Sequence, residues 1–382
     1  MRLPLPWRSL APLVLSVALV AAACGGSSDS ASSGPAATIS APTASETPTT
    51  AAPAETAVPT ETDTPTLPPE TTASPETTVP PETTVPPTTA APTDFSDVPT
   101  AALPPGILSE PNVAEVQRFL TDGDDGEFYM VNLIKHREQA QYADGRDTDL
   151  TGAEADAIYG EFIRTTMFPR IGAEVVYAAE VERDVIGGSS FDVVAVARYP
   201  SKSAFMQMTN DPEFQEMSVH KAAGVEETTV LATTLLEIPN APLLDNPPFP
   251  ATGDDPAFAF MHVLDYRDTA IYAEGDADAD NTRSGEDAVN TYSANAGTVA
   301  APLGIRPAAW FNVEATVIGP PGVWEEVRIN TFPSHATFSE LTSNPIWGSG
   351  SHHRTAGIAH TYAIMSLPQI NEFNGVLANT TG

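Results

Sequence analysis

Two histidines at matching positions of the sequence are the side chains best suited to proton transfer. His220 and His353 lie 133 residues apart, and each is followed by a basic residue and stands four residues before a glycine. Because imidazole titrates near neutral pH, either ring could act as a general base or donate a hydrogen bond to a ligand. The alternative is electrostatic, since a positive group near the C-terminus of a helix stabilises that helix.

Polar side chains also interrupt segments that are otherwise apolar. Asn132 and His262 occupy the same position in two expected strands, and a buried polar group must bond a neighbour or line a cavity. Tyr159 and Tyr292 match on an expected helix, where a tyrosine either completes the core or donates to a ligand. His220, Tyr159 and Asn132 are therefore the candidate catalytic residues.

Arg198 lies among valines and alanines in another expected strand. Its guanidinium could hold an anionic ligand, or it could pair with Asp192 or another acid. The second half of the sequence has Thr331 at the matching position. We predict that a ligand contacts residues that either occur at matching positions of the two repeats or lie in apolar segments. They are Asn132, Tyr159, Arg198, His220, His262, Tyr292 and His353.

One acidic segment partly resembles a calcium-binding loop. The sequence EGDADADN places Asp276, Asp278 and Asp280 at alternate positions. However, Asn281 stands where a calcium loop has glycine, and Asp287 stands where it has glutamate. An acidic, solvated loop is the alternative, and it is the one that we predict.

The histidines near the C-terminus form a second incomplete metal pattern. His352, His353 and His360 lie close together in sequence, but His360 is expected on the following strand. No cysteine or evident carboxylate completes a zinc set. Haem ligation through His220 or His353 is a further alternative. We predict neither a metal nor a cofactor, and the sequence contains no nucleophile elbow, phosphate loop or dinucleotide fingerprint.

The elements that must position these residues occur twice. FYMVNLIKHRE from Phe128 returns as FAFMHVLDYRD from Phe258, and YPSKSAF from Tyr199 returns as FPSHATF from Phe332. Two copies, each longer than 100 residues, exclude a solenoid of short repeats and predict two homologous domains that pack on each other. We place the first repeat at residues 101–240 and the second at residues 241–382.

Each repeat predicts the element order β, α, β, β, α, β. Thr151 with Glu154 and Ser284 with Asp287 form capping patterns that begin the first helix, and Asp211 caps a later helix that ends at Gly224. This order indicates an α+β fold of ferredoxin-like units, each an antiparallel sheet with helices on one face. The uncovered sheet faces must be buried, so we expect the two units to pack sheet to sheet. The strands of the first repeat are expected at 128–134, 174–181, 191–199 and 228–236, and two of their counterparts at 306–313 and 324–332.

The first repeat resembles a known family in four segments: MVNLIKHRE, YADGRDTDLTGAEADAIYG, FDVVAVARYPSKSAF and DPEFQEMSVHKAAGVEET. Together they are similar to the domain-of-unknown-function 1330 family, a branch of the dimeric α+β barrel superfamily. The resemblance covers Phe128 to about Glu237, and the second repeat, Phe258 to Leu367, is more divergent. It implies a barrel of two face-to-face sheets with a possible ligand cavity in each unit. It implies no reaction, because the activity of that family is not established. The superfamily includes cofactor-free monooxygenases, small-lactone isomerases and haem enzymes, so the fold alone does not select one of these reactions.

The N-terminus, residues 1–23, has the pattern of a secretory signal peptide. Arg2 and Arg8 precede an apolar run that is too short to span a bilayer, and three alanines precede Cys24, the only cysteine of the chain. This arrangement resembles the lipobox of bacterial lipoproteins, in which the cysteine is diacylated. The alternative is an ordinary cleavage site with an incidental cysteine. We therefore expect an extracytoplasmic protein, anchored to the bacterial cell membrane through Cys24.

Residues 24–100 consist almost entirely of Thr, Pro, Ala, Ser and Glu. Such a segment has too little apolar surface to offset the entropy of ordering, so we predict a disordered tether. The whole chain has 17 basic and 50 acidic residues. This balance makes nucleic acid an unsuitable partner, because phosphate binding needs a basic surface. Since one chain supplies both halves of the expected barrel, we also predict a monomer.

These expectations lead to three functional hypotheses. The first is a lipid-anchored binding protein that takes a small apolar or weakly anionic molecule into its barrel. The second is a cofactor-free enzyme of the monooxygenase or isomerase kind, which would use His220, Tyr159 and Asn132. The third is a structural envelope protein without a ligand.

Overall fold

The computed structural model describes residues 111–382, except 239–242, 277, 280–281 and 374–382. The expected signal peptide at 1–23, Cys24, the expected tether at 24–100, Asp280 and Asn281 lie outside the described residues. Within the described part of the chain, no helix is long and apolar enough to cross a membrane. Both repeats belong to one compact unit.

The strands form one closed antiparallel barrel in the order β1-β3-β2-β8-β5-β7-β6-β4. Each repeat contributes four strands in the same relative order, and the repeats are joined where β2 pairs with β8 and β4 pairs with β6. The prediction of a mixed α and β fold is confirmed, and the two expected sheets are hydrogen-bonded to each other at both edges. The strands are β1 (Phe128–His136), β2 (Glu174–Ile186), β3 (Val193–Tyr199), β4 (Val225–Leu235), β5 (Phe258–Tyr266), β6 (Arg306–Ile318), β7 (Glu326–Phe332) and β8 (Ile358–Asn371).

The strands that join the repeats are longer than the sequence patterns predict. The expected strand at 174–181 continues to Ile186, and the expected strand at 306–313 continues to Ile318. The added residues pair with β8 and β4 of the other repeat, and both ladders contain register shifts. Such bulges bend and twist a strand, which helps a sheet to close into a barrel. The extra length is therefore a consequence of pairing between the repeats.

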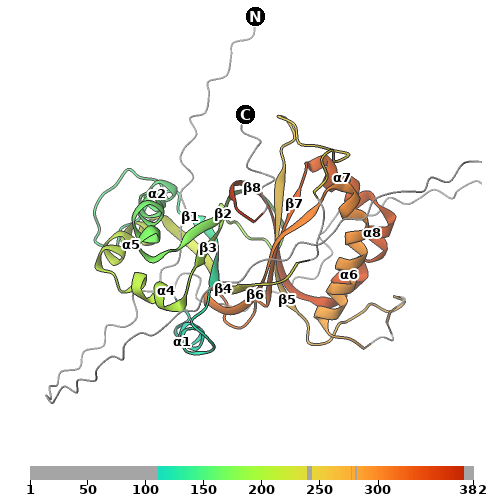
Figure 1. Cartoon of the computed structure of the whole chain (residues 1–382), viewed down its shortest axis with the longest axis horizontal. Coiled ribbons are helices and arrows are strands. Elements are labelled where there is room, and N and C mark those ends of the chain that lie inside the picture. The colour runs from blue at the N-terminus through green and yellow to red at the C-terminus, as the bar shows by residue number, and fades with distance from the viewer. Residues whose placement is uncertain (1–110, 239–242, 277, 280–281, 374–382) are drawn as a thin grey trace, which may run out of the picture. The chain divides into compact units, whose positions relative to one another are not determined.

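The helices cover the outside of the barrel. Figure 1 shows α2, α4 and α5 of the first repeat on one side of the strands and α6, α7 and α8 of the second repeat on the other. The expected N-caps at Thr151, Asp211 and Ser284 are all present. The helices are α1 (Val113–Thr121), α2 (Gly152–Phe162), η1 (Ile163–Met167), α3 (Phe168–Ile171), α4 (Lys202–Thr209), α5 (Pro212–Gly224), α6 (Gly285–Ala300), η2 (Ala301–Leu303), α7 (His335–Ser343), α8 (Pro345–Ser349) and α9 (Ser351–Gly357).

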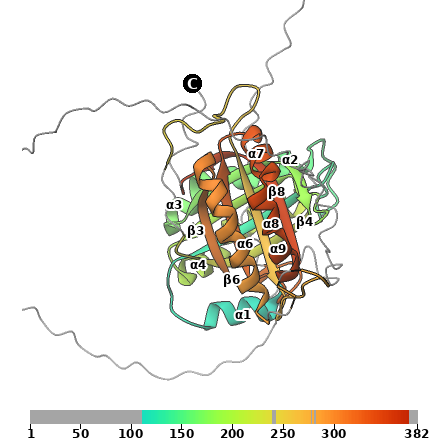
Figure 2. The same ribbon diagram turned by 90° about the vertical axis from the view of Figure 1, so that its right-hand side faces the viewer.

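Helix α1 precedes the first strand and was not expected from the sequence. It packs against β6 of the second repeat (Figure 2), where Arg118 Nη2 donates to the carbonyl of Glu314 at 2.6 Å. Asn112 Nδ2 donates to the carbonyl of Thr316 at 2.8 Å. The first repeat is therefore attached to the second by side chains as well as by strand pairing.

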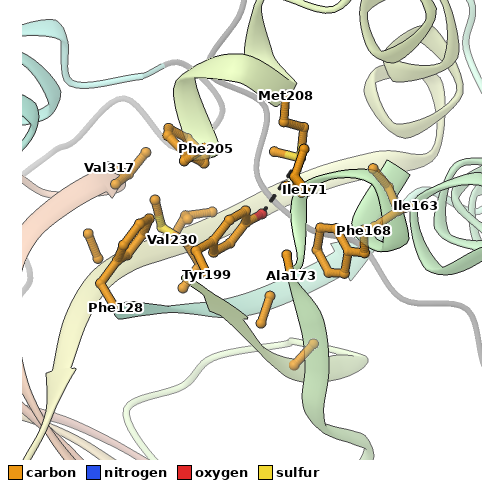
Figure 3. Close-up of a cluster of buried hydrophobic side chains, with 14 of the residues drawn as sticks. Phe128, Ile163, Phe168, Ile171, Ala173, Tyr199, Phe205, Met208, Val230 and Val317 are labelled. Carbon is orange, nitrogen blue, oxygen red and sulfur yellow. Dashed lines mark hydrogen bonds between the residues drawn. The ribbon is translucent and has the colours of Figure 1, made fainter. Parts of the chain in front are cut away.

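The hydrophobic core has three layers, one inside the barrel and one beneath the helices of each repeat. Strand β1 shows the alternation, since Tyr129 and Val131 belong to the inner layer and Phe128 and Met130 to the layer under the helices. In that outer layer Phe128 stacks on Tyr199 with ring centroids 5.1 Å apart (Figure 3). The same alternation places Asn132 on the helix-facing side of β1.

The last helix of the unit differs between the repeats. In the first repeat α5 is continuous, whereas in the second repeat its counterpart is divided into α8 and α9. Gly348 and Gly350 occupy the positions of Gln215 and Met217, at the constant offset of 133. Glycine disfavours a helix interior by roughly 1 kcal/mol, so these two substitutions explain the break.

Candidate functional site

Helices α2 and α5 approach each other closely at two glycines. A Cβ atom on Gly152 would lie 2.5 Å from the carbonyl oxygen of Gly224, and a Cβ on Gly224 would lie 2.3 Å from that of Gly152. Only glycine fits at either position. Asp156 lies one turn after Gly152, and Lys221 lies almost one turn before Gly224, so the helix contact buries both side chains.

A group of polar side chains lies next to this contact, and all of them are buried except His136, which is partly buried. We call His136, Asp156, Tyr159 and Lys221 the Lys221 cluster. His136 Nε2 lies 3.0 Å from Asp156 Oδ2, and Lys221 Nζ lies 5.7 Å from the centroid of the Tyr159 ring. Among the described residues, neither Lys221 Nζ nor Asp156 Oδ1 has a hydrogen-bond partner. A buried amine and a buried carboxylate oxygen are thus left with unused hydrogen-bonding capacity.

The protonation of the cluster follows from its burial. Desolvation lowers the pKa of Lys221 to about 8, although the negative charge of Asp156 acts in the opposite direction. Desolvation also raises the pKa of Tyr159 well above its ordinary value, and the charge of Asp156 adds to this effect. Near neutral pH the Lys221 amine can therefore exist in either protonation state, while the Tyr159 hydroxyl keeps its proton.

Two of the three candidate catalytic residues lie in this region, and the third does not. Tyr159 is a member of the cluster, and Asn132 is buried on the side of β1 that faces it, where its Nδ2 donates to the carbonyl of Met130 at 3.1 Å. His220 instead lies 2.7 Å, through Nδ1, from the hydroxyl of Tyr142. Sequence analysis missed Lys221 as a site residue, although it adjoins His220 and precedes the helix-ending glycine.

The pairing of tyrosine with histidine occurs in both repeats. Tyr272 lies 2.8 Å, through its hydroxyl, from His353 Nδ1. Desolvation lowers the pKa of His220, with the charge of Arg146 adding to the effect, and desolvation also lowers the pKa of His353. The tyrosines were detectable in sequence, because they begin the repeated motifs YADG and YAEG.

The equivalent region of the second repeat carries different charges. Val289 replaces Asp156 and Arg354 replaces Lys221, while Arg328 stands where the first repeat has Ala195. Arg328 pairs with the buried Glu326, with 2.6 Å between Nε and Oε1. It also bonds the side chains of Tyr266, Asn290 and Ser293. None of these partners was identified from the sequence.

His262 and Tyr292 lie beside these arginines. Desolvation and the positive charges of Arg354 and Arg328 lower the pKa of His262 to about 3, so this ring is neutral near pH 7. Its ring stacks on Phe260 with centroids 4.6 Å apart. Desolvation raises the pKa of Tyr292, against the charge of Arg354. Within the described residues, Arg354 Nη2 has no hydrogen-bond partner.

Arg198 lies apart from both regions. Its two terminal nitrogens pair with Glu127 at 2.9 Å and Glu174 at 2.6 Å, and its side chain is 36% exposed. Asp192, the partner considered from the sequence, instead accepts a hydrogen bond from the backbone nitrogen of His136. The Arg198 charge is thus engaged by two acids at the surface.

The structure combines parts of the two incomplete metal patterns. Asp278 of the acidic segment lies beside His352 and His353, whereas Asp276 accepts a hydrogen bond from the backbone nitrogen of Ala273. His360 lies on β8, as expected, and is hydrogen-bonded to Asp265. A carboxylate therefore does accompany two of the three histidines.

The fold and these sites define a mixed α and β protein built on a closed eight-stranded barrel from duplicated halves. The chain is 34% identical to RPA0582 over 35% of its own length and 98% of that protein, with a TM-score of 0.32. Over this span the chain belongs to the same family as RPA0582, a protein of unknown function from Rhodopseudomonas palustris. No family profile and no curated protein matches the chain.

More distant solved structures match a larger part of the chain. An anthrone oxidase-like protein is 10% identical, with 64% of this chain and 92% of that protein covered and a TM-score of 0.39. A chlorite dismutase variant from Candidatus Nitrospira defluvii is 11% identical, with 66% and 94% covered and a TM-score of 0.35.

Proposed function

We propose that the first repeat binds a small, weakly anionic molecule at the Lys221 cluster. The observation that carries the proposal is the buried Lys221 amine, whose Nζ has no hydrogen-bond partner among the described residues. Burying a charged amine is costly unless hydrogen bonds or an opposite charge compensate. An anionic ligand oxygen would supply both the hydrogen bond and the opposite charge, and a neutral carbonyl oxygen would supply the hydrogen bond.

The surroundings of Lys221 restrict the chemistry of the ligand. A carboxylate, enolate or carbonyl oxygen would accept from Nζ, and a ligand hydroxyl or N–H group could donate to Asp156 Oδ1. The rest of the ligand would meet apolar surface, since Tyr159 packs edge to face on Phe214 and both belong to the layer under the helices. The site therefore suits a small molecule with one acidic or polar end.

The cellular setting is part of the same proposal. A signal peptide at 1–23, a lipid-modified Cys24 and a tether at 24–100 would hold a monomeric barrel outside the cell membrane. We interpret each half as a ferredoxin-like unit, because its four strands lie in the order that this unit requires. Membership of the domain-of-unknown-function 1330 family rests on the four segments of the first repeat.

The lowered pKa of Lys221 favours one second candidate, a cofactor-free enzyme that moves protons. An amine with a pKa of about 8 can accept and return a proton near neutral pH. Tyr159, which stays protonated, would donate a hydrogen bond to a developing oxyanion. In this mechanism Lys221 takes the role of the base that the sequence suggested for His220.

A thermal-shift screen of small carboxylates and enolisable carbonyl compounds tests the proposal. We expect at least one compound to stabilise the full-length chain, and the Lys221→Met variant to lose that stabilisation. Lys202→Met is the matched control, because Lys202 Nζ binds the carbonyl of Asp122 away from the cluster. Equal stabilisation of parent and Lys221→Met would exclude the site, and failure of every compound would argue for a filled structural core.

A further inference from the structure

A carboxylate and two imidazoles converge in the second repeat. Asp278 Oδ2 lies 3.1 Å from His352 Nε2 and 3.5 Å from His353 Nε2, and the three ligand atoms all lie within 4.8 Å of one another. Ligand atoms held about 2.0–2.1 Å from a tetrahedral zinc ion are separated by roughly 3.3 Å. The two short separations therefore match those of atoms that share one metal ion.

The hydrogen bonds behind the imidazoles direct their Nε2 atoms toward this point. His352 Nδ1 lies 2.9 Å from the carbonyl oxygen of Ser349, which can only accept, so Nδ1 carries the proton. A neutral His352 then presents the lone pair of Nε2 to the carboxylate of Asp278. With Nε2 unprotonated, the imidazole and the carboxylate are two facing acceptors, and a cation between them can bind both.

His353 is held in a similar way. Its Nδ1 lies 2.8 Å from the Tyr272 hydroxyl, which can accept a hydrogen bond from it and leave Nε2 as the ligand atom. Histidines that bind metals usually have such a partner on the second nitrogen, and this partner orients the ring. Arg283 Nη2 lies 3.3 Å from the other carboxylate oxygen, Asp278 Oδ1. Each of the three side chains is thus oriented by a neighbour.

We propose that Asp278, His352 and His353 bind a divalent transition-metal ion. Two nitrogen ligands and one oxygen favour zinc, cobalt, nickel or copper over calcium and magnesium, which prefer oxygen. Three protein ligands leave a position for water or another ligand, an arrangement found in catalytic sites more than in structural ones.

The comparison of the repeats shows how this site differs from its counterpart. The first repeat keeps the pair of Tyr142 and His220, but Val219 stands where the second has His352. The loop that carries Asp278 is also longer, since Tyr272 to Ser284 spans 12 positions whereas Tyr142 to Thr151 spans 9. The break at Gly350 places His352 and His353 in the short helix α9. The second repeat therefore has two candidate ligands, Asp278 and His352, besides the pair that both repeats share.

Metal titration of the full-length, tag-free chain tests the proposal, with Zn²⁺ measured by calorimetry and Co²⁺ by its visible absorption. We expect one equivalent to bind, and His352→Val and Asp278→Asn each to weaken binding more than about 100-fold, because loss of a ligand exceeds the 10–100-fold effect of losing its supporting group. Tyr272→Phe should weaken it about 10-fold. His220→Ala, which alters the matching histidine of the first repeat, should bind like the parent.

Two results would overturn the proposal. The first is that the parent chain binds no metal ion stoichiometrically. Asp278 would then be only the ion-pair partner of the neighbouring histidines. The second is unchanged affinity in Asp278→Asn, a loop substitution that tests the site even if His352→Val does not fold.

Discussion

Tyr142 and His220 are 78 residues apart in sequence, yet the phenol oxygen lies 2.7 Å from the imidazole Nδ1 and the two rings meet at 90°. Tyr272 and His353 repeat this contact at 2.8 Å. Each pair attaches the loop after the first strand of its repeat to the last helix of the same repeat. The contact is therefore a feature of the duplicated unit.

We expect Tyr142→Phe to lower the free energy of unfolding by about 1 kcal/mol, which is typical for one partly buried hydrogen bond. Urea unfolding of the metal-free protein measures this loss. Tyr272→Phe should lose a similar amount under the same conditions. A change below the error of the experiment for both variants would show that the pairs do not hold the loops.

Replacing a glycine at a close contact between helices with alanine should destabilise the protein. Gly224→Ala should destabilise by about 1–3 kcal/mol or more, because its Cβ would meet a backbone oxygen 2.3 Å away. Gly357→Ala should behave alike, since its Cβ would lie 2.3 Å from the carbonyl of Gly285.

Gly297 is the control for this experiment. It lies inside α6, and a Cβ there would have no neighbouring atom within 4 Å. Gly297→Ala should therefore raise stability by up to about 1 kcal/mol through helix propensity. Thermal unfolding of the three variants would contradict the account if all three shifted in the same direction.

Much of the fold was predictable from the sequence, because the duplicated patterns are local. Thr151, Asp211 and Ser284 each signal a helix start by a side chain that caps the backbone, and all three do so. The lengths of β2 and β6 were not predictable in this way. Some of their last residues are polar, and their backbone pairs with strands of the other repeat. A local sequence pattern does not indicate such pairing.

The polar sites were less predictable, since they depend on contacts between distant segments. Asp156 and Lys221 are buried close enough for their charges to interact because two glycines allow α2 and α5 to touch. Asp278 and His352 are 74 residues apart and belonged to two separate incomplete patterns. The tyrosine that YADG and YAEG share was visible in the sequence, but its histidine partner could not be assigned without the fold.

Because Arg328 and Glu326 form a buried ion pair, the effects of replacing them on the free energy of unfolding should not be additive. Glu326→Val should destabilise by about 3–5 kcal/mol, because it leaves a buried guanidinium with one fewer anionic partner. Adding Arg328→Ala recreates Val193 and Ala195 of the first repeat, so the double variant should be more stable than the single one. Urea unfolding gives both values, and a double variant less stable than the single would contradict the account.

Lys221 predicts a particular pH dependence of stability. Its folded pKa, about 8, lies below the ordinary value of 10.5, so the unfolded chain binds more protons between these two pH values. The free energy of unfolding therefore rises as the pH increases from about 8 to 10.5. Below pH 8 the amine is charged in both states, and the cost of burying that charge is largest. Lys221→Met should be more stable than the parent by about 3 kcal/mol at pH 7, with the difference shrinking toward pH 10.5. A difference that grew with pH would contradict this sign.

Titration of the Lys221 amine by carbon-13 NMR tests the central claim most directly, since the chain has only three lysines and Lys221→Met assigns the signal. The account predicts a midpoint near pH 8 in the free protein. It also predicts that the acidic compound found by thermal shift raises this midpoint, because an anion beside Nζ favours the charged amine. A compound that stabilises the protein and leaves the Lys221 midpoint unchanged would show that it binds elsewhere, and the proposed site would then be wrong.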